Sequence, residues 1–279
     1  MSVLLETVGL KKYFQTAAGK LHAVDDINLK IGKGETLGVV GESGCGKSTL
    51  GRVILRLLEA DAGQILFEGK DLAKYKTEKD WMTIRGKKIS MVMQDPMTSL
   101  NPLKKIGRQI EESIELNQGI KGPEAKKMAL EMLKKVGIPD PERRYQQYPH
   151  EFSGGMRQRV VIAIAAACHP QILICDEPTT ALDVTIQAQI LNLIRDLQKE
   201  LNMTVIYITH DLGVVANVAD RVAVMYAGQI VEYGKVDEIF YDAWHPYTWA
   251  LLSALPQLGI KGEELPTIEG TPPNLFNEI

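Results

Sequence analysis

The sequence predicts an α/β fold in which a core with a parallel sheet carries an antiparallel β subdomain, an inserted α-helical subdomain and a short C-terminal extension. Residues 37–58 read as a buried strand, a glycine-rich loop and a helix, because an apolar run precedes glycines and then apolar residues at helical spacing. Residues 171–209 repeat strand, helix and strand with strongly apolar strands, which is typical of a parallel sheet covered on both faces. Between residues 101 and 148 helical spacing takes over, which indicates an inserted helical part.

The chain divides into four segments on this pattern. Short alternating apolar bursts before residue 41 predict an antiparallel sheet that leads into the glycine-rich loop, and residues 63–69 predict another strand of it. The segments are residues 1–100 for the antiparallel β subdomain and the first part of the core, 101–160 for the helical subdomain, 161–234 for the rest of the core, and 235–279 for the C-terminal extension.

Shorter signals place the remaining elements. We expect a buried strand at 89–94, a break in the helical subdomain at 137–141, where glycine and two prolines interrupt the pattern, and a long helix at 156–168. A hairpin turns at Ala227-Gly228, and the C-terminal extension holds two short helices before an irregular tail at 266–279.

The composition excludes several classes of protein. With Lys+Arg 32 against Asp+Glu 35 the net charge is −3, so nothing indicates the basic surface of a nucleic-acid-binding protein. The N-terminus lacks the features of a secretory signal, and the longest apolar run, 160–168, is far shorter than a membrane span. Cys45, Cys168 and Cys175 lie singly and without metal-ligand spacing, which indicates reduced thiols in a cytoplasmic chain.

The glycine-rich loop carries the first chemical signal. It fits G-x-x-x-x-G-K-[ST], the phosphate-binding loop of nucleotide hydrolases, and its residues are Gly41, Glu42, Ser43, Gly44, Cys45, Gly46, Lys47, Ser48 and Thr49. The glycines let backbone N–H groups turn toward a phosphate, to which the following helix presents its positive end. Lys47 supplies a charge for the β and γ phosphates of ATP, and Ser48 a hydroxyl for Mg²⁺. A chance glycine-rich turn is the alternative, and the strand ahead of the loop argues against it.

Two carboxylates follow a buried strand. Asp176 comes directly after the apolar run at 172–175, so we expect it at the strand end that faces a ligand, as the partner of Mg²⁺. Glu177 is suited to take a proton from the water that attacks ATP. The alternative is that both residues only cap a strand before Pro178, and the phosphate loop upstream favours the chemical interpretation.

His210 and Gln94 each follow a predicted strand of the same core. If the strands are neighbours, His210 would lie beside Glu177, where it could hold that carboxylate and hydrogen-bond the γ phosphate. Gln94 could bind Mg²⁺ or position the attacking water. A lone histidine at a strand end is more often structural, so both assignments depend on the surrounding motifs.

A second anion-accepting helix start lies at Ser153-Gly154-Gly155. One ATP does not need two clamps from a single chain, so we interpret this motif as a clamp on ATP held by a second subunit. That interpretation places ATP between two chains paired head to tail. The alternative is a serine-capped helix with glycines for close packing.

Taken together and in order, these motifs resemble the ATP-binding subunits of ABC transporters, over nearly the whole chain. The matching stretches are the phosphate loop, Gln94, Phe152-Ser153-Gly154-Gly155-Met156, residues 172–177, Ala181-Leu182-Asp183 and His210. The resemblance implies a P-loop NTPase (RecA-like) core and a dimer with two ATP molecules at its interface, where Asp183 acts across the dimer. It also implies an aromatic side chain against adenine, for which Phe14 fits best and Tyr13 second. Phe152 and Met156 depart from the leucine and glutamine usual in this motif, which leaves the contacts of the fifth side chain open.

Further stretches resemble the oligopeptide/dipeptide importer branch of this family. They are Gln94 to Pro102, Tyr148-Pro149-His150, Thr185 to Gln189, Met225 to Gly228 and His245-Pro246-Tyr247-Thr248. Such importers use two different ATP-binding subunits. The central body of this sequence resembles one of them, which we favour, and the start, Gly41 to Gly51 followed by Arg52, is similar to the other. Whether the pair is a homodimer or a heterodimer stays open as well. Members usually continue into a cysteine-rich segment that binds an iron–sulfur cluster. This chain reaches Ile279 before any such cysteines, so no cluster is expected in it.

The resemblance implies an ATP hydrolase that powers import of di- or oligopeptides and lies peripherally at the cytoplasmic face of the cell membrane. Its partners would be a second ATP-binding subunit, two transmembrane permease subunits docked near residues 94–101 and, indirectly, a solute-binding protein, but no nucleic acid. The same motor serves importers of nickel, glutathione or sugars. A soluble ABC ATPase would carry long coiled coils or a second nucleotide domain, and a GTP switch would carry Asn-Lys-x-Asp; the sequence has neither pattern.

Overall fold

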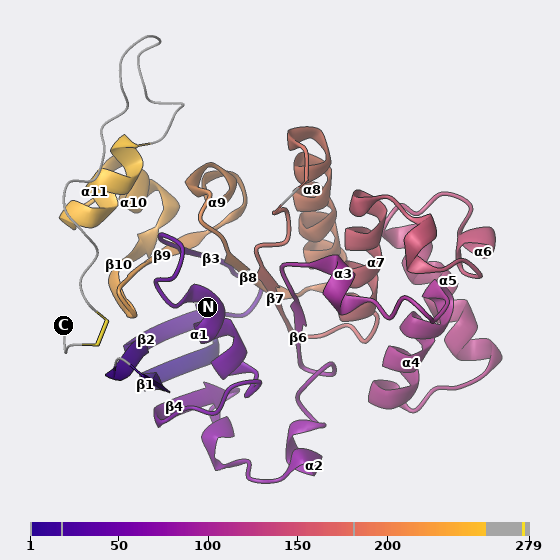
Figure 1. The fold of residues 1–279 in the computed structure, drawn as a ribbon, viewed down its shortest axis with the longest axis horizontal. Coiled ribbons are helices and arrows are strands. Elements are labelled where there is room, and N and C mark those ends of the chain that lie inside the picture. The colour runs from indigo at the N-terminus through magenta and orange to yellow at the C-terminus, as the bar shows by residue number, and fades with distance from the viewer. Residues whose placement is uncertain (1, 18, 181, 255–274, 277–279) are drawn as a thin grey trace. The chain divides into compact units, whose positions relative to one another are not determined.

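The structure is a computed structural model that describes residues 2–17, 19–180, 182–254 and 275–276 (Figure 1). The chain forms two compact units. The first unit comprises residues 1–76 and 206–279, and the second unit comprises residues 77–205. The irregular tail expected at 266–279 lies outside the described residues except for Leu275 and Phe276, and Leu275 accepts a hydrogen bond from the His22 N–H.

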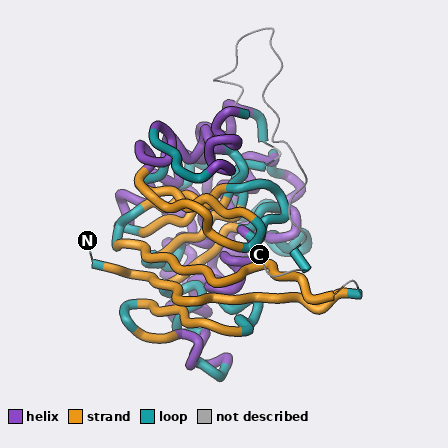
Figure 2. The backbone as a smooth tube through the Cα atoms, turned by 90° about the vertical axis from the view of Figure 1, so that its left-hand side faces the viewer, coloured by secondary structure: helices purple, strands orange, loops and turns teal. Residues whose placement is uncertain are grey.

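An antiparallel sheet in the order β2-β1-β4-β5 confirms the predicted β subdomain of the first unit. Its strands are β1 (Val3–Thr16), β2 (Gly19–Gly32), β4 (Ala62–Phe67) and β5 (Lys70–Asp71). Strands β1 and β2 run side by side over their whole length, from Val3 opposite Gly32 to Thr16 opposite Gly19 (Figure 2). Leu5 and Leu10 of β1 are buried in the core, which anchors one face of the sheet.

The first unit also holds neighbouring strands in the order β10-β9-β3-β8. They are β3 (Thr36–Val40), β8 (Thr204–Ile208), β9 (Arg221–Tyr226) and β10 (Gln229–Lys235), and the first two residues of β8 belong to the second unit. Strands β3 and β9 are parallel, and β9 and β10 form the predicted hairpin. Every residue of β3 and β8 is buried, as the apolar runs in the sequence predict.

The helices of the first unit flank these strands. They are α1 (Lys47–Ile54), the 3₁₀ helix η1 (Leu72–Lys74), α9 (Leu212–Val218), α10 (Val236–Tyr241) and α11 (Pro246–Ser253). Helical spacing continues to Leu58, but α1 ends at Ile54, so that part of the prediction is wrong. The reason is local: Arg56 adopts a left-handed φ of 50°, and Leu57 turns 44% of its surface to solvent.

In the second unit, β7 (Ile172–Asp176) and β6 (Ile89–Val92) are parallel neighbours. The helices are α2 (Glu78–Trp81), α3 (Pro96–Ser99), α4 (Ile106–Gln118), α5 (Pro123–Lys135), α6 (Pro141–Arg144), the 3₁₀ helix η2 (Pro149–Glu151), α7 (Gly154–Ala166) and α8 (Val184–Leu201). Strand β6 ends at Val92, two residues before the expected end at Gln94. Helix α7 begins two residues earlier than expected, because Ser153 caps it, and it ends two residues earlier, at Ala166.

In the helical subdomain, α4 packs against both α5 and α7 (Figure 1). Ile106, Ile110 and Ile114 lie on one face of α4 and are all completely buried. Gly107 stands between them because a Cβ there would lie 2.1 Å from the ring of Tyr145. The expected break after α5 is confirmed by the left-handed φ of 70° at Gly137.

Substitution of Gly38 in β3 tests the packing that holds this strand. We expect Gly38→Ala to destabilise the chain by roughly 1–3 kcal/mol, because a Cβ would lie 2.4 Å from Val215 Cγ1 of α9. Urea unfolding followed by circular dichroism measures the loss. Since Val215→Ala removes the clashing methyl groups, Gly38→Ala should cost less in that background than in the wild type. Equal costs in both backgrounds would contradict the steric explanation.

Candidate nucleotide-binding site

The phosphate loop joins the end of β3 to the start of α1 in the first unit. Gly41, Gly44 and Gly46 have φ values of 150°, 84° and 105°, in the region that favours glycine. A Cβ at Gly41 would lie 2.1 Å from the Met225 carbonyl oxygen, and one at Gly46 would lie 2.0 Å from that of Ala23. A Cβ at Gly44 would meet nothing within 4 Å. The loop backbone is therefore pressed against neighbouring strands at two glycines and open at the third.

Lys47 is buried at the start of α1, and its side chain folds back over its own loop. The Nζ donates to the carbonyl oxygens of Gly41 and Glu42, each at 2.7 Å, and lies 3.7 Å from Cys45 Sγ. Burial raises the pKa of the Cys45 thiol, while the Lys47 charge acts in the opposite direction. The thiol is thus protonated at neutral pH.

His210 follows β8 and is exposed. Thr209, the residue before it, donates its N–H to the Val39 carbonyl oxygen at 3.1 Å. This bond brings the end of β8 beside the end of β3, two residues before Gly41. Within the first unit, the structure therefore brings the backbone ahead of His210 close to the entrance of the phosphate loop.

The two carboxylates after β7 lie in the second unit. Asp176 is the last residue of β7 and only 1% exposed, which confirms the predicted strand end. Glu177 has a left-handed φ of 45°, and its Oε2 accepts from Gln94 Nε2 at 3.0 Å and from Thr180 Oγ1 at 2.9 Å. The structure thus brings Gln94 and Glu177 together. Thr180 has no motif of its own in the sequence, and only its place three residues after Glu177 hints at the contact.

Ser153 and Asp183 are both helix caps. The Ser153 hydroxyl accepts from the Met156 N–H at 3.3 Å at the start of α7, and the Asp183 carboxylate accepts from the Ile186 N–H at 2.9 Å at the start of α8. A Cβ at Gly155 would lie 2.7 Å from Ile186 Cγ2, so this glycine allows the two helices to pack closely. Ala181, part of the motif that precedes α8, lies outside the described residues.

Tyr13 and Phe14 are neighbours on β1 and point to opposite faces of the sheet. The Tyr13 hydroxyl donates to Asp25 at 2.5 Å, its ring lies 4.3 Å from that of His22, and the ammonium of Lys20 lies 4.1 Å from the ring. Phe14 is partly buried, and the Lys12 ammonium lies 5.5 Å from its ring. The Tyr13 ring is therefore held within its own sheet by more contacts than the Phe14 ring.

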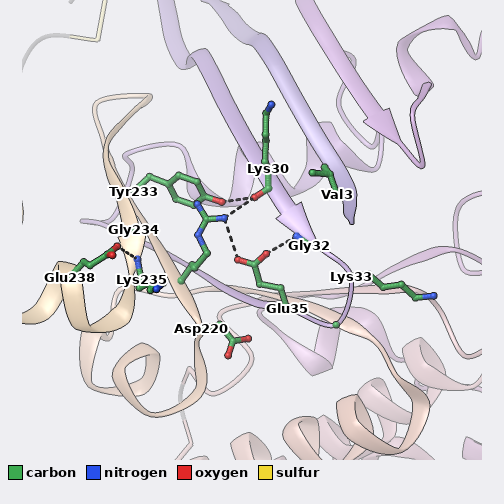
Figure 3. A pocket seen from close by; sticks show the side chains of 12 residues that line it. Val3, Lys30, Gly32, Lys33, Glu35, Asp220, Tyr233, Gly234, Lys235 and Glu238 are labelled. Atoms are coloured by element: carbon green, nitrogen blue, oxygen red, sulfur yellow. Dashed lines mark hydrogen bonds and ion pairs between the residues drawn. The ribbon is translucent and has the colours of Figure 1, made fainter. Parts of the chain in front are cut away.

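A pocket of about 820 Å³ in the first unit lies apart from the phosphate loop (Figure 3). The Arg221 guanidinium lies 4.0 Å from the centre of the Tyr233 ring and 3.7 Å from the Glu35 carboxylate, while the Tyr233 hydroxyl donates to the Lys30 carbonyl oxygen. None of the residues that line the pocket belongs to the loop. These contacts join the β9–β10 hairpin to β2 and to the turn after it.

Comparison with known proteins identifies the family. Residues 24–180 match the ABC transporter family, and residues 231–278 match the C-terminal region of oligopeptide/dipeptide transporters. The chain belongs to the ABC transporter family. Within that family it is an ATP-binding subunit of the oligopeptide/dipeptide branch, which confirms the resemblance drawn from the motifs.

Similar proteins support this assignment. The chain is 59% identical to the oligopeptide transport ATP-binding protein OppD of Bacillus subtilis, over 98% of this chain and 78% of that protein. It is 53% identical to AmiE of Streptococcus pneumoniae, over 100% of this chain and 79% of that protein. Among solved structures, the ATP-binding cassette MJ0796, a dimer in a post-hydrolysis state bound to ADP and Pi, superposes with a TM-score of 0.76 at 29% identity, over 84% of this chain and 99% of that chain. The ABC cassette fold predicted from the sequence is thereby confirmed.

Two features are absent from the part of the chain that the structure describes. No helix of the described residues combines the length and the apolar character that crossing a bilayer requires. Nor do three or more histidine, cysteine, aspartate or glutamate side chains gather in that part of the chain as a metal site of their own.

Proposed function

We propose that this ATP-binding subunit hydrolyses ATP in the presence of Mg²⁺, within a pair of cassettes, and thereby powers the uptake of di- or oligopeptides. The observation that carries the proposal is the contact between Gln94 and Glu177 directly after the buried end of β7, in a chain with a complete phosphate loop. The match of the C-terminal region and the similarity to OppD favour peptides over nickel, glutathione or a sugar as the transported solute.

The phosphate loop would bind the β and γ phosphates of ATP. Its N–H groups and the positive end of α1 attract anions, and Lys47 adds a full charge. The ammonium now bound to the carbonyl oxygens of Gly41 and Glu42 would instead donate to phosphate oxygens, which are stronger acceptors because they are charged. ATP would thus replace contacts that the loop makes with itself.

The donor set of this chain fits a magnesium ion bound together with ATP. Mg²⁺ takes oxygen ligands and is usually held by one or two carboxylates together with substrate phosphates, so no dedicated cluster of acidic residues is needed. The Ser48 hydroxyl, the Asp176 carboxylate and the Gln94 side-chain oxygen are donors of this kind. The ion would neutralise the charge that develops on the phosphates.

Glu177 would act as the general base. Its Oε2 accepts two hydrogen bonds, from Gln94 and Thr180, and these fix the direction of the carboxylate. A carboxylate held in this way can take a proton from water aligned with the γ phosphate. His210 would hydrogen-bond the γ phosphate and hold the same carboxylate.

The substitution Glu177→Gln separates binding from hydrolysis. We expect the rate of ATP hydrolysis to fall by roughly 10²–10⁴-fold, because the amide cannot accept the proton. ATP should still bind, since the amide oxygen can accept the hydrogen bonds from Gln94 and Thr180, and a closed dimer should accumulate. Steady-state phosphate release and size-exclusion chromatography with ATP measure the two effects. Unchanged turnover in the variant would refute the role of the base.

ATP would be enclosed by a second cassette. Ser153, Gly154 and Gly155 offer the start of α7 to the γ phosphate of the ATP bound by the partner, and Asp183 would contact the partner chain. The dimeric form of the similar cassette MJ0796 supports this arrangement. Phe14 would stack on adenine, with Tyr13 as the less suitable candidate because its ring is engaged by Asp25, His22 and Lys20.

A matched pair of cap substitutions tests the clamp. We expect Ser153→Ala to weaken ATP-dependent dimerisation roughly tenfold in the Glu177→Gln background, through loss of a hydroxyl at a charged phosphate. Thr77→Ala removes a comparable hydroxyl cap from the N-terminus of α2 and should leave dimerisation unchanged. Both variants should lose about 1 kcal/mol of stability from the lost cap. Analytical ultracentrifugation with ATP measures the dimer, and equal dimerisation by the two variants would argue against the clamp.

Two transmembrane subunits would dock on the surface around residues 94–101, on the cytoplasmic side of the membrane, and a solute-binding protein would act through them. Met97 lies within this stretch and exposes 58% of its surface, and Met93 and Leu103, which flank the stretch, expose 39% and 86%. Neighbouring exposed apolar side chains of this kind mark a protein–protein contact. The stretch begins next to Gln94, so a docked partner could influence the residue that contacts Glu177.

Leu103→Glu tests the docking surface, with Leu116→Glu as the matched control. Leu116 is 71% exposed on α4, outside the proposed surface, so both substitutions place a charge where solvent reaches it. We expect Leu103→Glu to reduce co-purification with the membrane subunits at least tenfold, because a carboxylate would be desolvated in the contact. Leu116→Glu should co-purify like the wild type. Equal recovery of the complex with both variants would place the contact elsewhere.

A further inference from the structure

The stretch His245-Pro246-Tyr247-Thr248 has no part in the site described so far, and the structure gives it a definite local form. The Glu232 carboxylate accepts the N–H groups of Trp244 and His245 at 2.8 and 3.1 Å. His245 then caps α11, since its Nδ1 accepts the Tyr247 N–H at 3.1 Å, and Pro246 occupies the first turn. These contacts fix the start of α11 and the direction of the Tyr247 side chain.

Tyr247 reaches the phosphate loop. Its hydroxyl accepts the Glu42 N–H at 3.0 Å. Tyr247 is only 7% exposed, and its ring lies 4.2 Å from the ring of Tyr226, in a core cluster that includes Val40 and Leu252. Burial raises the pKa of Tyr247 well above its ordinary value, so the hydroxyl stays neutral over the whole physiological range.

The peptide group that joins Gly41 to Glu42 is thereby held from two sides. Its N–H, that of Glu42, donates to Tyr247, and its carbonyl oxygen, that of Gly41, accepts from Lys47 Nζ at 2.7 Å. A peptide group on which the ammonium rests before a phosphate arrives is therefore itself positioned by α11. Both contacts lie within the first unit, as does the loop.

We propose that Tyr247 is a positioning residue for nucleotide binding: its hydroxyl fixes the entrance of the phosphate loop and, through the Gly41–Glu42 peptide, the ammonium of Lys47. The inference rests on the proposed function, because it assigns Tyr247 to the same ATP site. It gives the C-terminal region shared with oligopeptide/dipeptide transporters, residues 231–278, a task in the binding of ATP. Tyr247 itself contacts the loop and no reacting atom.

The experiment compares Tyr247→Phe with Tyr226→Phe in the full chain. Each removes one phenol hydroxyl and keeps the paired rings, but only the first removes the acceptor of the Glu42 N–H. With ADP and Mg²⁺ as the probe in isothermal titration calorimetry, we expect the Kd of Tyr247→Phe to rise about 3- to 10-fold, as for the loss of one hydrogen bond. Tyr226→Phe should bind like the wild type. The KM for ATP should rise by a similar factor, with kcat changed less than twofold.

A third variant distinguishes a specific effect of Tyr247 on the phosphate loop from a general loss of stability. Leu252→Ala opens a cavity in the same core cluster without touching the loop, so it should lower the melting temperature while leaving the Kd for ADP within twofold of the wild type. If Leu252→Ala weakens ADP binding as much as Tyr247→Phe does, the role of Tyr247 is packing and the proposal is overturned. An unchanged Kd in Tyr247→Phe overturns it as well.

Hydrogen exchange gives a readout that does not depend on nucleotide. The Glu42 amide should be protected in the wild type and should exchange about fivefold faster in Tyr247→Phe, while the Val40 amide of β3 keeps its rate. An unprotected Glu42 amide in the wild type overturns the proposal even if Tyr247→Phe fails to fold. Failure of the wild type to bind ADP would instead refute the proposed function, and the exchange result would still decide whether Tyr247 holds the loop.

Discussion

The close approach of the phosphate loop to its neighbours is the constraint on which the first unit depends. Only glycine fits where the loop lies against the carbonyl oxygens of Met225 and Ala23, at 2.1 and 2.0 Å from a Cβ. Gly228, in the hairpin turn, adds a hydrogen bond from its N–H to the Cys45 carbonyl oxygen at 3.0 Å. The antiparallel sheet and the β9–β10 hairpin thus support the loop.

The positive charge of Lys47 is stabilised inside the loop by contacts that a phosphate can replace reversibly. A buried ammonium without partners is costly, and Lys47 avoids that cost by donating to carbonyl oxygens of its own loop. Carbonyl oxygens are weaker acceptors than phosphate oxygens, so the exchange on binding is favourable while the empty loop stays ordered. Tyr247 adds to this arrangement, because it holds the Gly41–Glu42 peptide, which offers one of those carbonyls.

The sequence predicted the parts of the fold that depend on strong local patterns. The buried strands, the hairpin and the long helices appear where apolar periodicity places them, and the phosphate-loop glycines adopt the φ values that their motif requires. The short helices α2, α3 and α9 were missed, because four to seven residues are too few for a periodic pattern. The end of α1 was misplaced, since Leu57 continues the helical spacing although the chain has already turned at Arg56.

The candidate site also has parts that local patterns predict and parts that they do not. The loop, the two carboxylates and Ser153 are predictions that local motifs allow. The bond from Gln94 to Glu177 and the contact of Tyr247 with the loop, in contrast, join residues 83 and 205 positions apart, and no local pattern encodes such pairs. Their discovery required the tertiary structure. The resemblance to a family had already marked the stretches that contain them, but it gave no contact for Tyr247.

The backbone of Glu177 has a consequence for how this protein can change. A side chain held at a φ of 45° costs on the order of 1–3 kcal/mol, which glycine would largely avoid. Glycine, however, has no carboxylate to offer. Selection for thermal stability and selection for ATP turnover therefore act in opposite directions at this position. In a library of variants screened only for thermal stability, glycine should become enriched at position 177, and ATP hydrolysis should be lost.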